Sequence, residues 1–297
     1  MASRGDFHLH STASDGILSP SELVDLAYSH GVRVMALTDH DSTEGVTEAR
    51  AAAARHGDLT LIPGVEMGTD VPGGEVHVLG YYLEPENEEL QAILARLREG
   101  RRGRGLGIVE KLNEMGLAVT WEQVQRIAGD ASVGRPHVAQ ALLDKGYVRD
   151  IKEAFDKYIG RNGPAYVERE KMTPAEAVAT IVRLGGVACL AHPTDFGGRE
   201  DGAASPLDLD ALLTELKAAG LAGMEVYYKE YPPETVERLR TTARKYGLVA
   251  WGGTDYHGIH GPNEPFPGQM HSPLTEESIE ALLELGRERA AGRARKA

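Results

Sequence analysis

Residues 6–16 read Asp6-Phe-His-Leu-His-Ser-Thr-Ala-Ser-Asp-Gly16, so two histidines end the first short apolar run of the chain. His8 and His10 lie two positions apart, and on an extended strand both side chains point to the same side. That spacing suits two imidazoles on one metal ion, although an exposed strand with two histidines has the same pattern. The residues elsewhere in the chain are needed to distinguish a metal site from an exposed strand.

Short apolar runs recur along the chain after this first one. They fall at residues 32–37, 59–66, 76–83, 187–191, 221–228 and 248–253. Each run has the length and composition typical of a buried strand. Gly73-Gly74, between two of the runs, indicates a hairpin.

Helical patterns separate most of these runs. Ser19-Pro20-Ser21-Glu22 has the signature of a helix start, and Thr173-Pro174-Ala175-Glu176 repeats it. Further helices are expected at residues 44–56, 209–219, 233–246 and 274–289. Alternating strands and helices predict parallel βα units in an α/β fold. Their number favours a closed or nearly closed barrel, with a doubly wound sheet as the alternative.

Residues 101–168 interrupt this alternation. They contain helix-like segments at 121–128, 136–144 and 151–158 and no convincing strand. We therefore expect a small all-helical insertion domain at 101–168, within a barrel domain formed by residues 1–100 and 169–297. Arg101-Arg102-Gly103-Arg104-Gly105 is a possible hinge leading into the insertion, and a single continuous helix through this segment is the alternative.

Composition bounds the class of protein. The 297 residues are 41% hydrophobic and 26% charged, which is enough to build a core. The single cysteine, Cys189, excludes an internal disulfide framework and a cysteine-rich zinc module. A formal charge of −13 does not attract a long nucleic-acid backbone. The N-terminus has no signal core and no apolar stretch has membrane-spanning length, so we expect a cytoplasmic protein without a membrane partner.

Nine imidazoles and carboxylates accompany the apolar runs. They are His8, His10, Asp15, His40, Glu66, His77, His192, Asp255 and His257. Each alone has an ordinary structural explanation, such as a turn cap or a solvated loop. Comparable ends of successive parallel strands converge at one face of an α/β fold, however, so these side chains are expected to meet.

The donor types indicate which ions such a site would hold. Imidazole and carboxylate without thiolate suit Mn, Fe or Zn. Nine donors exceed the need of one ion, so two or three divalent ions are expected. Four further histidines lack this strand-end context and are left out of the site. They are His30, His56, His260 and His271.

The motifs that carry these residues resemble those of the PHP (polymerase and histidinol phosphatase) family. Beside residues 6–16 they are Thr38-Asp39-His40, Gly64-Val-Glu66, Val76-His77, Ala191-His192-Pro193 and Thr254-Asp255-Tyr-His257. The resemblance implies a distorted (β/α)7 barrel with a trinuclear metal site at its C-terminal rim.

The same resemblance implies how the ligands divide among three ions, with Glu66 bridging two of them. The first set is His8, His10, Glu66 and Asp255. The second is Glu66, His77 and His192. The third is Asp15, His40 and His257. Asp39 is expected to orient a ligand rather than to bind an ion.

The helical insertion and Gly134-Arg135-Pro136-His137 resemble the nucleotide-directed branch of the family. That branch removes the 3′-phosphate of nucleoside 3′,5′-bisphosphates, and some members trim short RNA from its 5′ end. Arg135 and His137 are the predicted catalytic residues that contact substrate phosphate, because a guanidinium fork fits phosphate geometry. The structural alternative is that Arg135-Pro136 only begins a helix.

The expected reaction is phosphoester hydrolysis by a metal-activated hydroxide. Three divalent ions against the three carboxylates would leave roughly +3 at the site, which favours a small nucleotide or short single-stranded RNA over duplex nucleic acid. Three alternatives remain open: a histidinol-phosphate-type phosphatase, a metal-binding module without catalysis, and a metal-dependent amidohydrolase.

Overall fold

A single seven-stranded sheet is the framework of the computed structural model. The model describes residues 3–71, 74–129, 133–168, 172–194, 208–259 and 264–294. The strands are β1 (Gly5–Asp6), β2 (Val34–Leu37), β3 (Thr60–Val71), β4 (Gly74–Tyr81), β5 (Val187–Leu190), β6 (Gly223–Tyr228) and β7 (Val249–Gly253). They lie side by side in the order of the sequence.

The sheet is parallel at both ends and antiparallel in the middle. β1, β2 and β3 run parallel, as do β5, β6 and β7, whereas β4 runs antiparallel to both of its neighbours. The expected β3–β4 hairpin is therefore confirmed, although Gly73 itself lies outside the described residues. The segment after β1 bonds to β7 and to the segment after it: the Phe7 amide donates to Gly252 O (3.1 Å) and the His10 amide to Tyr256 O (3.0 Å). These bonds bring the two sheet edges together, so the nearly closed barrel is confirmed over the doubly wound alternative.

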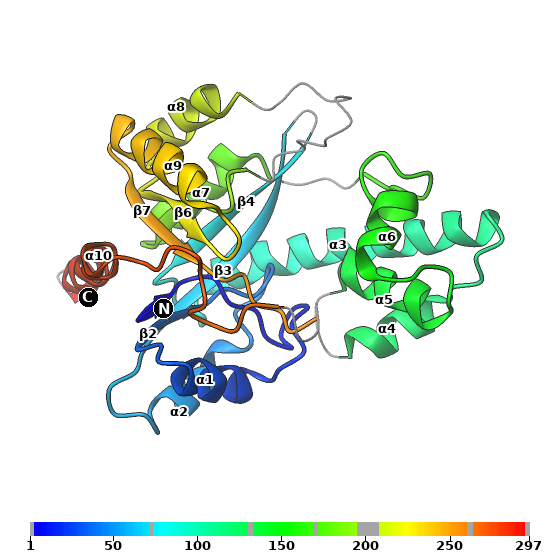
Figure 1. Ribbon diagram of the computed structural model, residues 1–297, viewed down its shortest axis with the longest axis horizontal. Coiled ribbons are helices and arrows are strands. Elements are labelled where there is room, and N and C mark those ends of the chain that lie inside the picture. The colour runs from blue at the N-terminus through cyan, green and yellow to red at the C-terminus, as the bar shows by residue number, and fades with distance from the viewer. Residues whose placement is uncertain are drawn as a thin grey trace.

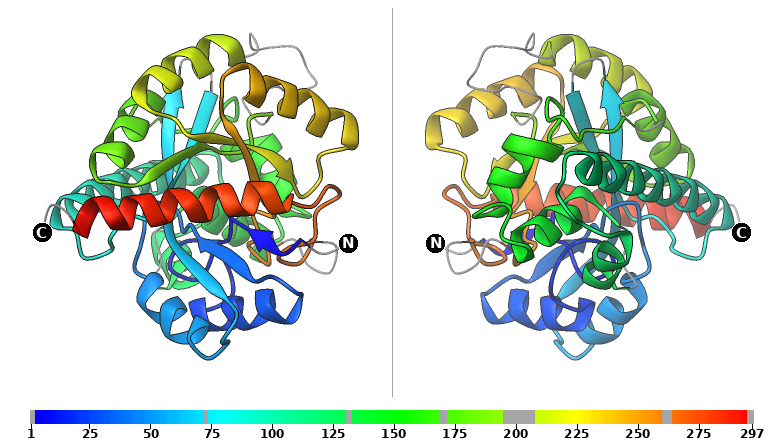
Figure 2. Two further views of the ribbon diagram at one scale, coloured as in Figure 1. Left: turned by 90° about the vertical axis from the view of Figure 1, so that its left-hand side faces the viewer. Right: turned by 90° about the vertical axis from the view of Figure 1, so that its right-hand side faces the viewer.

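Helices cover the outside of the barrel. They are α1 (Pro20–Ser29), α2 (Val46–Ala53), α7 (Pro174–Arg183), α8 (Leu209–Ala219), α9 (Pro233–Lys245) and α10 (Glu276–Ala294). Both predicted capping boxes are present, with Ser19 and Thr173 accepting from the amides of Glu22 and Glu176. In Figure 1, α1 and α2 lie below the sheet and α7, α8 and α9 above it. Figure 2 shows α10 crossing the molecule beside β1.

The helical part of the chain projects away from the barrel, on the right of Figure 1. It consists of the second half of α3 (Glu88–Glu114), α4 (Trp121–Ala128), α5 (Arg135–Asp144), α6 (Ile151–Ala154) and the π-helical turn η1 (Phe155–Ile159). Helix α3 runs without a break through residues 101–105, so the continuous helix is correct and the hinge is wrong. Among the described residues of 101–168 there is no strand.

Two hydrophobic clusters meet along α3. Leu90, Leu94 and Leu97 of its first half belong to the barrel cluster, and Ile108 and Leu112 of its second half belong to a separate helical cluster. The exact domain boundary at residue 101 stays a prediction, because α3 takes part in both clusters. No helix in the described part of the chain combines the length and apolar character needed to cross a bilayer.

Candidate metal centre

The predicted ligands come from one edge of the barrel. Residues beyond the carboxyl ends of β1, β2, β5 and β7 supply His8, His10, Asp15, His40, His192, Asp255 and His257. Glu66 and His77 instead lie within β3 and β4, where an isolated bridge pairs Glu66 with His40. Since β4 is antiparallel, its first residues lie at the edge where the parallel strands end. All nine candidates therefore reach one region, although two of them are not at strand ends.

The backbone is strained at this edge. Among the described non-glycine residues, only Asp41, Tyr82, His192 and Asp255 have positive φ, and the last two are predicted ligands with φ of 23° and 49°. Such conformations cost roughly 1–3 kcal/mol each and cluster at functional sites. The fold thus holds His192 and Asp255 in conformations that local preferences alone would not select.

Glu66 is the hub of the cluster, with five imidazoles around one carboxylate. The distances from Oε2 are 3.1 Å to His8 Nε2, 3.1 Å to His10 Nε2 and 3.1 Å to His40 Nδ1. The distances from Oε1 are 2.7 Å to His77 Nδ1 and 3.3 Å to His192 Nε2. The two oxygens face different sets of imidazoles, which is the arrangement a bridging carboxylate would have.

One compact group of donors matches the first predicted ligand set. His8, His10, Glu66 and Asp255 offer atoms that all lie within 4.8 Å of one another. Asp255 Oδ1 is 3.3 Å from His8 Nε2 and 3.1 Å from His10 Nε2. A divalent ion at the centre of this group would have two imidazoles and two carboxylates around it.

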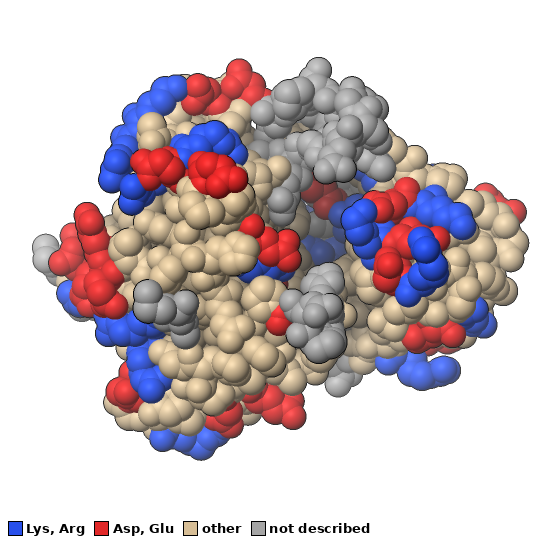
Figure 3. All heavy atoms as spheres, in the orientation of Figure 1, with Lys and Arg blue, Asp and Glu red and all other residues tan. Residues whose placement is uncertain are grey.

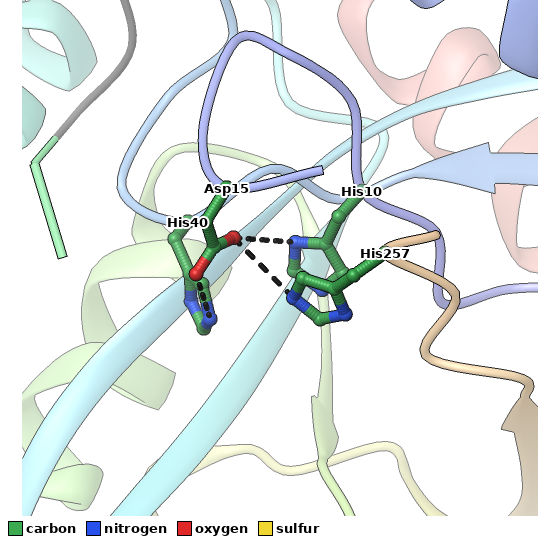
Figure 4. A group of neighbouring side chains, drawn as sticks. All are labelled: His10, Asp15, His40 and His257. Carbon is green, nitrogen blue, oxygen red and sulfur yellow. Dashed lines mark ion pairs between the residues drawn. The ribbon is translucent and has the colours of Figure 1, made fainter. Parts of the chain in front are cut away.

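A second group contains the third predicted set together with His10. His10, Asp15, His40 and His257 also lie within 4.8 Å of one another, and Figure 4 shows their side chains turned toward a common centre. Asp15 Oδ1 is 3.3 Å from His257 Nε2 and 3.8 Å from His10 Nδ1, and Asp15 Oδ2 is 3.9 Å from His40 Nε2.

A third group joins His40, Glu66 and His77 within the same limit. The predicted second set has His192 where this group has His40, and both imidazoles lie close to Glu66. The structure therefore brings all nine predicted residues together. Their division among individual ions stays a prediction.

Buried polar atoms in the cluster test whether cations fit it. His8 Nε2, His10 Nε2, Asp15 Oδ1, His40 Nδ1 and Glu66 Oε2 are buried and form no hydrogen bond among the described residues. Buried polar groups almost always have a hydrogen-bond partner, so five exceptions in one place require an explanation. Divalent cations would satisfy all five atoms, and the donor set is one that Mn, Fe and Zn accept.

The carboxylates remain ionised despite their burial. Burial alone would raise the pKa of Glu66, but the imidazoles of His40, His8 and His77 hold it well below its usual value. Burial acts on Asp255 in the same direction, and Lys229, followed by His8, holds its pKa well below the usual range. Ionised carboxylates are the form that binds a metal ion.

The imidazoles divide into two kinds. Burial lowers the pKa of His40 well below its usual value, although Glu66 and Asp15 act in the opposite direction. Burial also lowers the pKa of His10, but contacts with Asp255 and Glu66 outweigh it and raise the pKa to about 10. A cation at His10 therefore has to compete with a proton.

Glu225 supports the ligands and was not predicted from the sequence. It lies fully buried in β6, where its Oε1 is 3.1 Å from His8 Nδ1 and its Oε2 accepts the His192 amide at 2.7 Å. A carboxylate on a ligating imidazole fixes the orientation of the ring. Its only signal in the sequence was an acidic residue inside the apolar run 221–228.

Asp39 is hydrogen-bonded to the loop that follows β1 rather than to a predicted ligand. Its carboxylate accepts from the Ser11 amide, the Ser11 hydroxyl and the Ser14 hydroxyl, each at 2.7 Å. Ser14 Oγ in turn lies 3.4 Å from His10 Nδ1. The expected orienting role of Asp39 therefore has a route through Ser14.

Basic side chains face the ligand cluster across a cavity of about 420 Å³, which we call the metal-side cavity. Its basic lining residues are Arg101, Arg104, Arg135, Lys152 and Lys229. Arg101 Nε donates to Asp41 Oδ2 (2.5 Å), and Glu75 accepts from both Arg104 and Arg135. Figure 3 shows a hollow between the barrel and the helical part, with basic side chains inside it. The same cavity is lined by ligand residues such as His40, His77 and His257, so an anion in it would lie close to both the basic side chains and the ligand cluster.

The structure separates the two predicted phosphate-binding residues. Arg135 lines the metal-side cavity, whereas His137 lines an adjoining cavity of about 280 Å³. The Gly134 amide donates to His137 Nδ1 (2.9 Å), and Pro136 lies in the first turn of α5. The helix-start explanation therefore holds for this motif, and phosphate contact by either residue stays a prediction.

Two of the histidines left out of the site lie elsewhere. His30 stacks on Phe266 with ring centroids 4.5 Å apart, and His56 Nε2 is 2.7 Å from Asp25 Oδ1. His271 belongs to no ligand group found among the described residues. His260 lies outside them.

Comparisons with known proteins agree with this geometry. Residues 6–166 match the family model of the PHP domain. The chain is 35% identical over 253 residues to a 3′,5′-nucleoside bisphosphate phosphatase of Chromobacterium violaceum, covering 85% of this chain and 86% of the relative. It is 34% identical over 257 residues to a 5′-3′ exoribonuclease of Haemophilus influenzae, covering 86% and 91%.

A solved structure shares the architecture as well. An amidohydrolase from Chromobacterium violaceum, with bound sulfate and no metal, superimposes with a TM-score of 0.83 at 32% identity, covering 94% of this chain and 96% of that one. The family match spans more than half of the chain, and relatives above 30% identity span most of it. The chain therefore belongs to the PHP domain family of metal-dependent phosphoesterases and is a hydrolase.

Proposed function

We propose that this protein hydrolyses phosphate monoesters of small nucleotides, most directly the 3′-phosphate of nucleoside 3′,5′-bisphosphates. One observation carries the proposal: a basic wall of arginines and lysines faces a buried imidazole–carboxylate cluster across a single cavity. A cavity of this kind suits a substrate with more than one phosphate, because one can lie on the ligand cluster while another meets the basic wall.

Different residues of the chain would hold the ions and bind the phosphate. The three donor groups around Glu66 would hold two or three divalent ions. When bound, such ions polarise the phosphate and lower the pKa of water. Arg135 would bind a phosphate oxygen pair with its planar fork. Lys229, with Nζ 3.6 Å from Asp255 Oδ2, would hold that carboxylate in place through an ion pair. It would also add positive charge beside the phosphate.

The distribution of charge favours a small substrate over a long polyanion. The site gains positive charge when ions bind, while the chain as a whole carries −13. A focused positive site attracts a small anion, whereas the acidic surface repels a long polyanion. The partners we expect are a nucleoside 3′,5′-bisphosphate or short single-stranded RNA, with no stable duplex partner.

A second candidate is the trimming of short RNA from its 5′ end. It is favoured by the 34% identity to the Haemophilus influenzae 5′-3′ exoribonuclease. Both reactions cleave a phosphoester of a nucleotide, so one metal site could serve both. They differ in what leaves: inorganic phosphate in one case and a nucleotide in the other.

A product screen with metal analysis tests the proposal. Purified protein is incubated with adenosine 3′,5′-bisphosphate, a short 5′-phosphorylated RNA and histidinol phosphate, and its Mn, Fe and Zn content is measured on the same preparation. We expect phosphate release from the bisphosphate, with bound metal. A strong preference for histidinol phosphate would support the small-molecule alternative. Bound metal without turnover of any substrate would support the non-catalytic module.

A further inference from the structure

The cavity that contains His137 differs chemically from its neighbour. It has a volume of about 280 Å³, and its apolar lining is Ile17, Ile127, Ala128, Pro136, Ile151 and Ile259. Neutral polar side chains are added by Thr12, Ser14 and Gln140. We call it the isoleucine cavity. These residues come from the loop before α1, from α4, α5 and α6, and from the segment after β7, so the barrel and the helical part build it jointly.

The isoleucine cavity adjoins the metal-side cavity. Both are lined by Asp15, Pro136, Ile151 and Ile259. Asp15 belongs to one of the three donor groups, so the isoleucine cavity begins beside a candidate metal ligand. A single small molecule could therefore place one part in each cavity.

Charge separates the two cavities. Arg101, Arg104, Arg135, Lys152 and Lys229 all line the metal-side cavity. Among the described lining residues of the isoleucine cavity, Asp15 is the only charged side chain. A phosphate is stabilised in the first cavity, whereas the second favours a neutral, largely apolar group.

His137 gives the isoleucine cavity a defined hydrogen-bonding group. Because the Gly134 amide donates to Nδ1 (2.9 Å), Nδ1 acts as an acceptor and the ring proton is on Nε2. The side chain is buried, and burial lowers the pKa of His137, which keeps the ring neutral. A neutral N–H donor in an apolar cavity fits the ring nitrogen or carbonyl oxygen of a heterocycle.

We propose that the isoleucine cavity binds the nucleobase of the substrate, with His137 as its hydrogen-bond donor, while the phosphate lies in the metal-side cavity. The proposal rests on the proposed function and adds to it the part of the enzyme that recognises the base. His137 then serves base recognition and not phosphate binding.

Paired ligands that differ only in the base test this proposal. AMP and ribose 5-phosphate carry the same phosphate and sugar, and their dissociation constants are measured by calorimetry on the metal-loaded protein. Base binding in an apolar slot predicts that AMP binds roughly 10-fold or more tightly than ribose 5-phosphate. Ile127→Trp and Gln140→Trp fill the cavity from two different helices, so one remains informative if the other fails to fold.

Each result decides a separate point. Both cavity variants should reduce the AMP preference toward equality. Met115→Trp, on the exposed end of α3, should retain the preference. Equal affinity of the wild-type protein for the two ligands, or an unchanged preference in both folded cavity variants, would overturn the base site. Hydrolysis of adenosine 3′,5′-bisphosphate under those results would leave the proposed function standing, whereas a base preference without any hydrolysis would overturn the proposed function alone.

Discussion

At the residue scale, the role of Glu66 follows from its position among five imidazoles. Glu66→Gln keeps the size of the side chain but removes its charge and one donor oxygen. Loss of a group that merely orients a ligand costs about 10–100-fold in metal affinity or activity, so loss of a shared ligand should cost at least about 100-fold. We expect this loss in kcat together with reduced metal content, measured by elemental analysis.

A matched variant separates ligand loss from general disturbance of the cavity. Glu75 lines the same cavity but belongs to none of the three donor groups among the described residues. Glu75→Gln should therefore retain the metal content of the wild-type protein. Full metal content in Glu66→Gln would refute the bridging role.

Replacing Arg135 is expected to change the KM for the nucleotide rather than the metal content. A hydrogen bond to a charged group contributes about 1.5–3 kcal/mol, so Arg135→Ala should raise KM for the nucleotide by roughly 10–100-fold while metal content stays constant. Arg135→Lys should recover only part of the loss, because lysine lacks the bidentate fork. Arg149, with a side chain 86% exposed, is the control position for an alanine variant. Unchanged kcat and KM in Arg135→Ala would show that this side chain does not contact the substrate.

At the element scale, α3 connects the barrel to the helical part without a hinge. Its glycines have different surroundings: a Cβ at Gly105 would lie 3.0 Å from the Trp121 ring, while a Cβ at Gly103 would have no atom within 4 Å. Gly105 is thus explained by close packing of α4 on α3, whereas nothing in the packing explains Gly103.

This difference predicts opposite effects of two alanine substitutions. Gly103→Ala should stabilise the protein by about 0.5–1 kcal/mol, because glycine weakens a helix interior. Gly105→Ala should lose this gain or reverse its sign, since the Trp121 ring must move. Chemical denaturation of both variants measures the free energy of unfolding. Destabilisation by Gly103→Ala would mean that α3 has to bend at this position.

Local signals in the sequence predicted most elements well. The expected helices at 121–128 and 209–219 coincide with α4 and α8, and both capping boxes are present. The end of β3 was missed, because the strand continues to Val71 beyond its apolar run. The course of α3 could not be decided locally, since its glycines are accommodated by contacts with α4 and with Val167.

The candidate site, too, was predictable from the sequence only in part. Its nine donor residues are chemically distinctive and recur beside strands, so the sequence was sufficient to predict that they meet. Apart from Arg135, the basic wall was not predictable, because Arg101 and Arg104 come from the middle of a helix and Lys229 follows a strand without a motif. Only the tertiary arrangement turns these ordinary cations toward the ligands.

At the scale of the whole molecule, the donor cluster links distant parts of the chain. Its residues range from His8 to His257, and the groups draw on both ends of the sheet as well as on the central hairpin. Bringing buried carboxylates and imidazoles together without a cation leaves polar atoms unsatisfied, which costs free energy. An ion that binds only the folded chain offsets this cost and stabilises the barrel as a unit.

Metal removal should therefore lower the melting temperature as well as the activity. At an ion concentration 100-fold above Kd, binding contributes about 2.7 kcal/mol, which corresponds to a shift of roughly 4 °C for a protein of this size. Calorimetry with and without a chelator measures the shift, and re-addition of Mn, Fe or Zn should restore it. Glu66→Gln should show a smaller chelator effect than the wild-type protein, because the variant holds less metal beforehand. Identical melting temperatures of metal-loaded and chelated wild-type protein would contradict a structural contribution of the ions and would leave the orphaned buried atoms of the cluster without their explanation.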